Sequence, residues 1–186
     1  MADAPADTNE LSDSALRALA ERAGRLLLQQ RRRIATAESC TGGWVAKCLT
    51  DIPGSSQWFE RGYVTYSNLA KEQSIGVAAS VIETFGAVSR PTVEQMAAGA
   101  LHDSGADLAL AITGIAGPDG GSPDKPVGLV WFALAQRAAA PVAVQHQFAG
   151  DREAIRRAAV AIALRLVITA ATGADTGAAA TGRAQP

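Results

Sequence analysis

Apolar positions along the chain recur either every three to four residues or in short continuous runs. The first pattern predicts amphipathic helices, because 3.6 residues make one helical turn, and the second predicts buried strands. Ser12 and Asp151 precede two of the helical segments as capping residues. The predicted helices cover residues 12–30, 44–51, 67–75, 91–104 and 152–172, and the predicted strands cover residues 34–37, 59–66, 108–113, 127–135 and 142–148.

Strands and helices alternate through most of this order, which is typical of an α/β protein whose sheet is covered on both faces. The strands 127–135 and 142–148 are separated by a short connection, so we expect them to form a hairpin and the sheet to be mixed. The two ends, 1–11 and 173–186, are composed of small and polar residues. They are predicted to be flexible tails on one domain of residues 12–172.

The composition argues against several classes of protein: charge-driven nucleic-acid binders, zinc or disulfide-rich proteins, and membrane or secreted proteins. The 186 residues carry 17 Lys and Arg against 18 Asp and Glu, and this balance argues against a direct, charge-driven nucleic-acid binder. The two cysteines, Cys40 and Cys48, form neither a disulfide framework nor a zinc motif, so no metal is expected. The longest apolar stretch, 158–171, is interrupted by Arg165 and is too short to span a bilayer. The start of the chain lacks the apolar segment of a secretory signal, and we expect a cytoplasmic protein without membrane contact.

The most informative segment is Ile34–Gly43. A short apolar strand runs into the sequence ESCTGG (38–43), a turn of small residues that opens a helix and places Ser39 at its corner. Backbone N–H groups at the start of such a helix point toward whatever binds there. This geometry suits an exposed nucleophile beside an oxyanion hole. The alternative is that Ser39 only caps the helix.

A nucleophilic serine needs a base. His102 lies near the end of a helix and His146 lies within a strand, so both are expected to be surface or half-buried polar residues. Lys71 follows the end of another strand and is the remaining candidate. A lysine acts as a base only when it is neutral, which requires burial or a cationic neighbour that lowers its pKa. Taken alone, Lys71 is equally consistent with an exposed lysine on a polar segment.

Two further segments suit ligand binding. The loop after strand 108–113 is dense in Gly and Pro, and glycines allow a backbone to approach a ligand closely. Arg152 and Arg156 lie at the start of the last helix, where guanidinium groups fit an anion such as phosphate. An ordinary surface loop and solvated arginines are the alternatives.

Together these segments resemble the CinA C-terminal domain family. Seven motifs carry the resemblance in order along nearly the whole chain: AESCTGG (37–43), PGSS (53–56), GYVTYSNLAK (62–71), GAVS (86–89), ITGIAGPDGG (112–121), KPVG (125–128) and GDR (150–152). The resemblance implies a three-layer α/β/α fold with a mixed sheet of about five strands. It also implies hydrolysis of the carboxamide of nicotinamide mononucleotide, giving nicotinate mononucleotide and ammonia, without a cofactor or metal. Family members tend to self-associate, so a homo-oligomer, most simply a dimer, is expected.

Carried over by motif, Ser39 is the nucleophile and Lys71 the base, with Tyr66 and Thr113 assisting. The Thr113 hydroxyl and backbone donors around Cys40–Gly42 are expected to stabilise the oxyanion, and Arg152 is the first candidate for a phosphate contact, ahead of Arg156. The residues expected to bind the substrate are Cys40, Thr41, Gly42, Gly114, Arg152 and Arg156.

Two alternatives from other classes stay open at the level of the sequence. One is an amidase in which Cys40, Glu38 and Lys71 carry the chemistry. The other is a non-catalytic nucleotide-binding or competence-associated module. An assay of ammonia release from nicotinamide mononucleotide distinguishes an enzyme from such a module.

Overall fold

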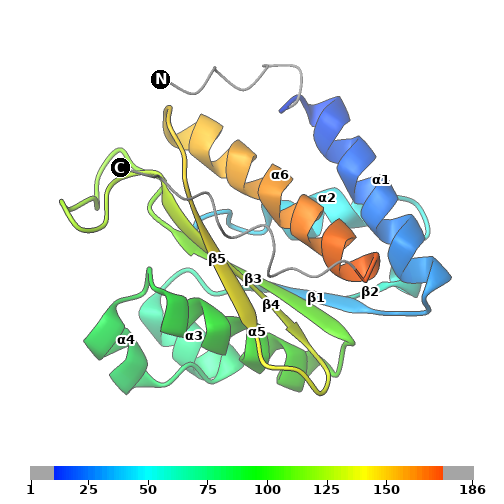
Figure 1. Cartoon of the computed structure of the whole chain (residues 1–186), viewed down its shortest axis with the longest axis horizontal. Helices are drawn as coiled ribbons and strands as arrows, with labels where there is room; N and C mark the ends of the chain where they lie inside the picture. The colour runs from blue at the N-terminus through cyan, green and yellow to red at the C-terminus, as the bar shows by residue number, and fades with distance from the viewer. Residues whose placement is uncertain (1–10, 174–186) are drawn as a thin grey trace, which may run out of the picture.

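The computed structural model describes residues 11–173, which fold into a five-stranded mixed sheet with helices on both faces (Figure 1). The helices are α1 (Asp13–Gln29), α2 (Trp44–Thr50), α3 (Asn68–Ile75), α4 (Ala79–Phe85), α5 (Arg90–Ser104) and α6 (Arg152–Ala171), with a 3-10 turn at Ser55–Gln57. The strands are β1 (Ile34–Glu38), β2 (Phe59–Val64), β3 (Leu108–Gly114), β4 (Leu129–Gln136) and β5 (Val142–Gln147). The predicted α/β class and mixed sheet are confirmed.

The sheet has the order β2-β1-β3-β4-β5. Strands β2, β1 and β3 are parallel, whereas β4 and β5 form the predicted antiparallel hairpin beside β3. Ala37 of β1 pairs with Tyr63 on one side and Ala111 on the other. Because these three strands run in the same direction, their carboxyl ends meet at one edge of the sheet, which is where α/β proteins place their ligands.

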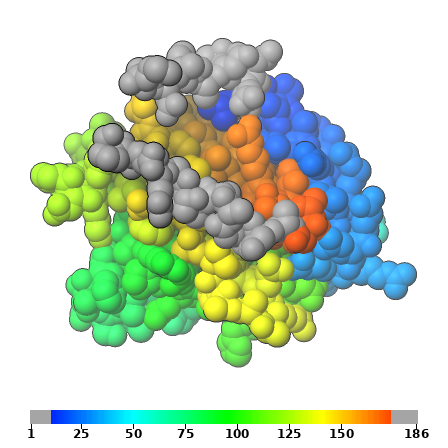
Figure 2. All heavy atoms as spheres, viewed as in Figure 1, coloured from blue at the N-terminus to red at the C-terminus, as the bar shows by residue number. Residues whose placement is uncertain are grey.

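Each face of the sheet has its own core. Helices α1, α2 and α6 cover one face, and α3, α4 and α5 cover the other (Figure 1). Along β3, Leu108, Leu110 and Ile112 point into the first core, whereas Ala109 and Ala111 point into the second. This alternation follows from the two-residue period of a strand. On the outside of the first core, α6 lies between α1 and β5 (Figure 2).

Helix α3 is held tightly against α5. A Cβ atom at Gly99 of α5 would lie 1.8 Å from the Ile75 carbonyl oxygen, so only glycine permits this approach. Ser67 caps the start of α3 by accepting a hydrogen bond from the Ala70 N–H. The helix that carries Lys71 is therefore fixed at both ends.

The predicted elements are found with small shifts at their ends, and one helix was not predicted. The strand expected at 59–66 ends at Val64, and α4 lies in a segment for which no element was predicted. The predicted flexible tails, 1–11 and 173–186, lie almost wholly outside the described residues. Within residues 11–173, no helix is long and apolar enough to cross a membrane.

Candidate active site

Ser39 lies at the corner where β1 ends, as predicted. Its backbone N–H donates to the Ile112 carbonyl of β3, and its carbonyl accepts from the Gly42 N–H at 3.0 Å, which closes a four-residue turn. Gly42 and Gly43 follow with φ angles of +63° and +93°, values that glycine adopts without strain. The turn bends the chain sharply into α2 and leaves the Ser39 side chain at the end of the sheet, 9% exposed.

Glu38, the last residue of β1, occupies the start of α2. Its carboxylate accepts hydrogen bonds from the Thr41 hydroxyl at 2.7 Å and from the N–H groups of Gly43, Val45 and Ala46 at 2.8–3.1 Å. The expectation that these helix N–H groups point toward a ligand is therefore wrong. A buried carboxylate satisfies them from within the protein, as an anion at a helix N-terminus should.

The Lys71 amine reaches Ser39 from α3. Its Nζ lies 3.2 Å from Ser39 Oγ, 2.9 Å from the Thr65 carbonyl oxygen and 3.2 Å from the Tyr66 carbonyl oxygen. The residue is 1% exposed, so the alternative of an exposed lysine is wrong. Ser39 Oγ contacts this amine and not a helix N–H, so the alternative that Ser39 only caps α2 is wrong as well.

Burial lowers the pKa of Lys71, because a buried ammonium loses its hydration. Within residues 11–173 no carboxylate forms an ion pair with it. A neutral amine has two N–H groups and one lone pair. The carbonyls of Thr65 and Tyr66 match the two N–H groups, which leaves the lone pair facing the Ser39 hydroxyl. The cationic neighbour anticipated as an alternative to burial plays no part in this shift.

A cavity of about 270 Å³ opens over Ser39 and Lys71; we call it the small cavity. It lies where the carboxyl ends of β1, β2 and β3 meet. Its lining residues are Ser39, Cys40, Tyr66, Lys71, Ala87, Val88, Thr113, Gly114, Ile115, Ala116, Gly117, Asp119, Gly120 and Arg152. Seven of the predicted site residues are thus brought together: Ser39, Cys40, Tyr66, Lys71, Thr113, Gly114 and Arg152.

Arg152 lies at the mouth of the small cavity. Its Nη1 donates to the Gly117 carbonyl at 2.8 Å, and its Nη2 donates to the hydroxyl of Tyr66 at 3.0 Å. Tyr66 is 58% exposed, so this pair is accessible to a ligand from solution. A guanidinium and a phenol at a cavity mouth suit a phosphate group.

Thr113 is buried in the wall of the small cavity, but its hydroxyl proton is already used. Its Oγ1 donates to the Ala87 carbonyl at 2.8 Å. The expected role of this hydroxyl as an oxyanion donor is therefore not supported. The contact instead holds the segment Gly86–Ser89 against the end of β3.

Thr41, Gly42 and Arg156 line a different cavity, contrary to expectation. This large cavity of about 680 Å³ lies on the other side of the turn, between α1, α2 and α6. Its lining residues are Asp13, Ser14, Leu16, Arg17, Thr41, Gly42, Gly43, Trp44, Lys47, Cys48, Asp51, Arg156 and Arg157. Arg156 stacks on the Trp44 ring and donates to the carbonyls of Cys40 and Thr41, so it lies behind the turn.

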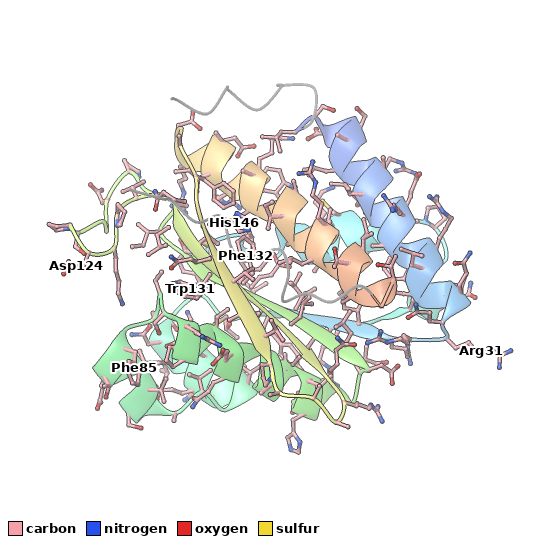
Figure 3. All side chains as sticks on the ribbon, in the orientation of Figure 1. Arg31, Phe85, Asp124, Trp131, Phe132 and His146 are labelled. Atoms are coloured by element: carbon pink, nitrogen blue, oxygen red, sulfur yellow. The ribbon has the colours of Figure 1, made fainter. Side chains whose placement is uncertain are left out.

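The wall opposite the turn includes residues that were assigned no role from the sequence. Ala87 and Val88 line the small cavity from the connection between α4 and α5, and the GAVS motif was the only signal for them. The long loop after β3 supplies Asp119 and reaches back through Lys125, whose Nζ donates to the Phe85 carbonyl at 2.6 Å. Figure 3 shows Phe85 at the end of α4 and Asp124 near the tip of that loop.

The cysteines are poorly suited to nucleophilic chemistry. Burial raises the pKa of the Cys40 thiol to about 12 and that of Cys48 to about 11. A thiol of such high pKa is almost entirely protonated near neutral pH, whereas the thiolate is the nucleophile. Glu38 already accepts four hydrogen bonds and lines neither cavity, which further disfavours an amidase built on Cys40, Glu38 and Lys71.

The histidines lie away from the site, as expected. His102 is exposed on α5, and His146 of β5 is half-buried. The His146 ring stacks on Phe148 and meets the edge of Phe132, which lies beside it in Figure 3. Among the described residues, no group of three or more His, Cys, Asp or Glu side chains is arranged to hold a metal ion.

Comparisons with known proteins identify the family of the chain. A sequence profile of the CinA C-terminal domain family matches residues 16–171. The chain is 55% identical over 155 residues to the nicotinamide-nucleotide amidohydrolase PncC of Escherichia coli K12, covering 83% of this chain and 94% of that protein. It is 53% identical over 140 residues to a CinA-like protein of Geobacter sulfurreducens, covering 75% of this chain and 34% of that longer protein.

Solved structures show the same fold. The competence/damage inducible protein CihA of Agrobacterium tumefaciens superposes with a TM-score of 0.82 at 43% identity, covering 92% of this chain and 99% of that one. A CinA superfamily protein of Klebsiella pneumoniae gives a TM-score of 0.81 at 36% identity, covering 85% of this chain and 98% of that one. The match to the family profile, residues 16–171, includes the whole sheet and every segment that lines the small cavity.

Proposed function

The chain belongs to the CinA C-terminal domain family, and on that basis we propose that it is a nicotinamide-nucleotide amidohydrolase. It hydrolyses the carboxamide of nicotinamide mononucleotide to nicotinate mononucleotide and ammonia, a step of pyridine nucleotide salvage in the cytoplasm. The observation that carries the proposal is the contact of 3.2 Å between Lys71 Nζ and Ser39 Oγ inside a cavity. The choice of substrate is supported by relatives that the chain matches along most of their length, because these proteins are named nicotinamide-nucleotide amidohydrolase.

In the first half of the reaction, neutral Lys71 accepts the proton of Ser39 Oγ as the oxygen attacks the carboxamide carbon. The C–O bond forms, and the carbonyl oxygen becomes an oxyanion. Cys40 lines the same cavity, and its backbone N–H donates to no other residue among 11–173, its one internal contact being the thiol of Cys40 itself, so we assign it as the oxyanion donor. The Lys71 ammonium then gives its proton to the leaving nitrogen, the C–N bond breaks, and ammonia departs.

In the second half, water attacks the ester that joins the nicotinoyl group to Ser39. Lys71, neutral again, accepts a proton from the water and gives it to Ser39 Oγ as the C–O bond to that oxygen breaks. The carboxylic acid then loses its own proton to solvent. The products are the free carboxylate of nicotinate mononucleotide and the restored Ser39 hydroxyl. Throughout the cycle the Thr65 and Tyr66 carbonyls hold the Lys71 amine in place.

The remote end of the substrate binds at the cavity mouth. We assign its phosphate to Arg152, with the Tyr66 hydroxyl as a second contact. Phosphate lies far from the reacting carboxamide, so these contacts hold substrate and transition state equally and act mainly on KM. Gly114 ends β3 at the wall of the small cavity, and a Cβ atom there would lie 2.7–2.9 Å from Val130 and Leu129, so its glycine serves the packing of β3 against β4.

Ammonia release from nicotinamide mononucleotide tests the proposal directly. We expect the wild-type protein to release ammonia and Ser39→Ala to lose at least about a thousandfold of that activity, because no attacking oxygen remains. Cys40→Ala is the matched control in the same turn and should keep most of the activity. Loss of activity in Cys40→Ala but not in Ser39→Ala would transfer the nucleophile to Cys40. No ammonia from the wild-type protein would favour the non-catalytic module.

A further inference from the structure

Arg156 reaches from α6 to the back of the turn that carries Ser39. Its Nε donates to the Cys40 carbonyl at 3.1 Å, and its Nη2 donates to the Thr41 carbonyl at 3.0 Å. The guanidinium carbon lies over the Trp44 ring, 5.3 Å from its centre, which is a cation–π contact. Because Arg156 lines the large cavity and not the small one, it lies across the turn from the reacting atoms.

A chain of hydrogen bonds connects this guanidinium to the small cavity. Arg156 Nη2 binds the carbonyl of the peptide unit that joins Thr41 to Gly42. The N–H of that unit donates to the Ser39 carbonyl at 3.0 Å. That carbonyl belongs to the next peptide unit, whose N–H is that of Cys40. This series of hydrogen bonds therefore ends on the Cys40 N–H, which donates to no other residue among 11–173, and Cys40 is a lining residue of the small cavity.

We propose that Arg156 is a positioning residue that orients and polarises the Cys40 N–H group as the oxyanion donor. The proposal rests on the proposed amidohydrolase function. A cation on one carbonyl strengthens the N–H of the same peptide unit as a donor, and hydrogen bonds in series reinforce one another. The effect grows as negative charge develops on the substrate oxygen, so it acts in the transition state more than in the bound substrate.

The geometry favours arginine over lysine at this position. Two carbonyl oxygens from successive residues are held by two different nitrogens of one planar group, and an ammonium has no such fork. The rigid fork also fixes the direction of both carbonyls, which sets the direction of the N–H groups on the same peptide units. The cation–π contact with the Trp44 ring adds to these two hydrogen bonds.

Arg157 is a matched control for this proposal. It follows Arg156 on α6, lines the same large cavity and lies 5.0 Å from the centre of the same Trp44 ring. Its hydrogen bonds go to Asp13, Glu153 and the Leu11 carbonyl instead of the turn. Substitution of Arg157 removes an equal charge and a similar ring contact without breaking the chain of hydrogen bonds.

The experiment compares kcat and KM for nicotinamide mononucleotide in Arg156→Ala, Arg156→Lys and Arg157→Ala. Loss of a whole oxyanion donor lowers the rate by about 10²–10³-fold, and a weakened donor should cost less. We therefore expect kcat of Arg156→Ala to fall about 10–100-fold with little change in KM, while Arg157→Ala stays near the wild-type value. Arg156→Lys should recover only a small part of the loss, because one ammonium cannot hold both carbonyls in a plane.

Chemical rescue separates this role from a general loss of structure. The large cavity leaves room for a small cation in place of the missing side chain. Millimolar methylguanidinium should raise kcat of Arg156→Ala several-fold and leave Arg157→Ala unchanged. Melting temperatures measured alongside identify any variant that has lost its fold. An increase in KM at constant kcat would overturn the proposal and place Arg156 on the substrate phosphate, and equal losses in both variants without rescue would reduce it to a packing role.

A second measurement tests the role of Arg156 without using nicotinamide mononucleotide as the substrate. A fluorophosphonate probe phosphonylates an activated serine through a transition state with a charged oxygen, and intact mass spectrometry measures its rate on Ser39. If the wild-type protein is labelled but releases no ammonia, the proposed substrate is wrong, and the labelling rates of the variants still test Arg156. If labelling of the Arg156→Ala protein is as fast as that of wild type, the inference is wrong. If the wild-type protein shows neither reaction, both the function and the inference fall.

Discussion

The two cavities on either side of the Ser39 turn differ in size and in how their charges are compensated. The large cavity has about 680 Å³ and the small one about 270 Å³. Every charged side chain that lines the large cavity has a partner within the protein. These partnerships are Arg157 with Asp13, Lys47 with Asp51, Arg17 with Glu21, and Arg156 with two backbone carbonyls.

In the small cavity, the cationic form of Lys71 would have only two backbone carbonyls and the Ser39 hydroxyl as partners. Lys71 is almost fully buried there, no carboxylate pairs with it among the described residues, and burial lowers its pKa. A buried amine without a counter-ion is unfavourable for stability, so its presence calls for a function. The comparison teaches that a buried amine without a counter-ion beside a nucleophile identifies a reactive site better than cavity volume does.

Among the substitutions that test this contrast between the cavities, removal of the Lys71 amine should have the largest effect on activity. We expect Lys71→Ala and Lys71→Arg to lose at least about a thousandfold in kcat, because neither offers a neutral nitrogen; arginine cannot deprotonate in proteins. In the wild-type protein, kcat/KM should rise with pH along a limb below the ordinary lysine pKa of about 10.4, since only the neutral amine accepts a proton. Rates of ammonia release across pH 6–10 check both expectations. Near-normal kcat in Lys71→Arg would show that Lys71 acts through its charge, and another base would have to be found.

Much of the fold could be predicted from the sequence because its periodicity is strong. The buried run of β3 and the capped helix α6 were predicted nearly to their ends. Helix α4 was not, because it has seven residues, one buried side chain at Ile82 and no side-chain cap at Ala78. Too few positions are buried there to create a helical period.

The candidate site could be predicted only in part. The corner position of Ser39 follows from a local pattern, whereas the approach of Lys71 depends on how α3 packs below the sheet and was supported by family resemblance. Arg152 and Arg156 are four residues apart and therefore just over one turn apart on α6, about 6 Å along its axis. That single turn places them on opposite sides of the Ser39 turn, a separation that depends on the packing of α6 and not on its sequence.

Substitution of Glu38 tests what holds the Ser39 turn, which separates the two cavities, in place. Its carboxylate holds the turn against α2, so Glu38→Gln leaves an amide NH₂ facing backbone N–H donors that need an acceptor. Each buried donor without a partner costs about 1–3 kcal/mol, and we expect the free energy of unfolding to fall by about 3 kcal/mol. Denaturant unfolding measures this loss. A protein of normal stability without activity would contradict the structural role and revive Glu38 as a catalytic residue.

Substitution of Arg152 tests which of the two cavities binds the phosphate of the substrate. Hydrogen bonds to a charged group contribute roughly 1.5–3 kcal/mol, so Arg152→Ala should raise KM for nicotinamide mononucleotide about tenfold to a hundredfold. The value of kcat should change much less, because the contact is remote from the carboxamide. Nicotinamide riboside, which lacks the phosphate, is the matched control, and its KM should be insensitive to the substitution. An unchanged KM for the nucleotide would move the phosphate away from the mouth of the small cavity.

The smallest expected effect is on the free energy of unfolding. Its pH dependence tests whether Lys71 lacks a counter-ion in the folded protein. The folded protein lowers the pKa of Lys71, so between that value and the ordinary value near 10.4 the unfolded chain binds more protons than the folded one. Stability must then rise with pH across this window, and each unit of depression contributes about 1.4 kcal/mol. In Lys71→Met this contribution is absent. We therefore expect the free energy of unfolding of the wild-type protein to increase relative to Lys71→Met as pH rises from 7 to 10, measured by urea unfolding at each pH. A decrease would mean that the folded state favours the ammonium, as a partner carboxylate would, and the distinction between the two cavities would fail.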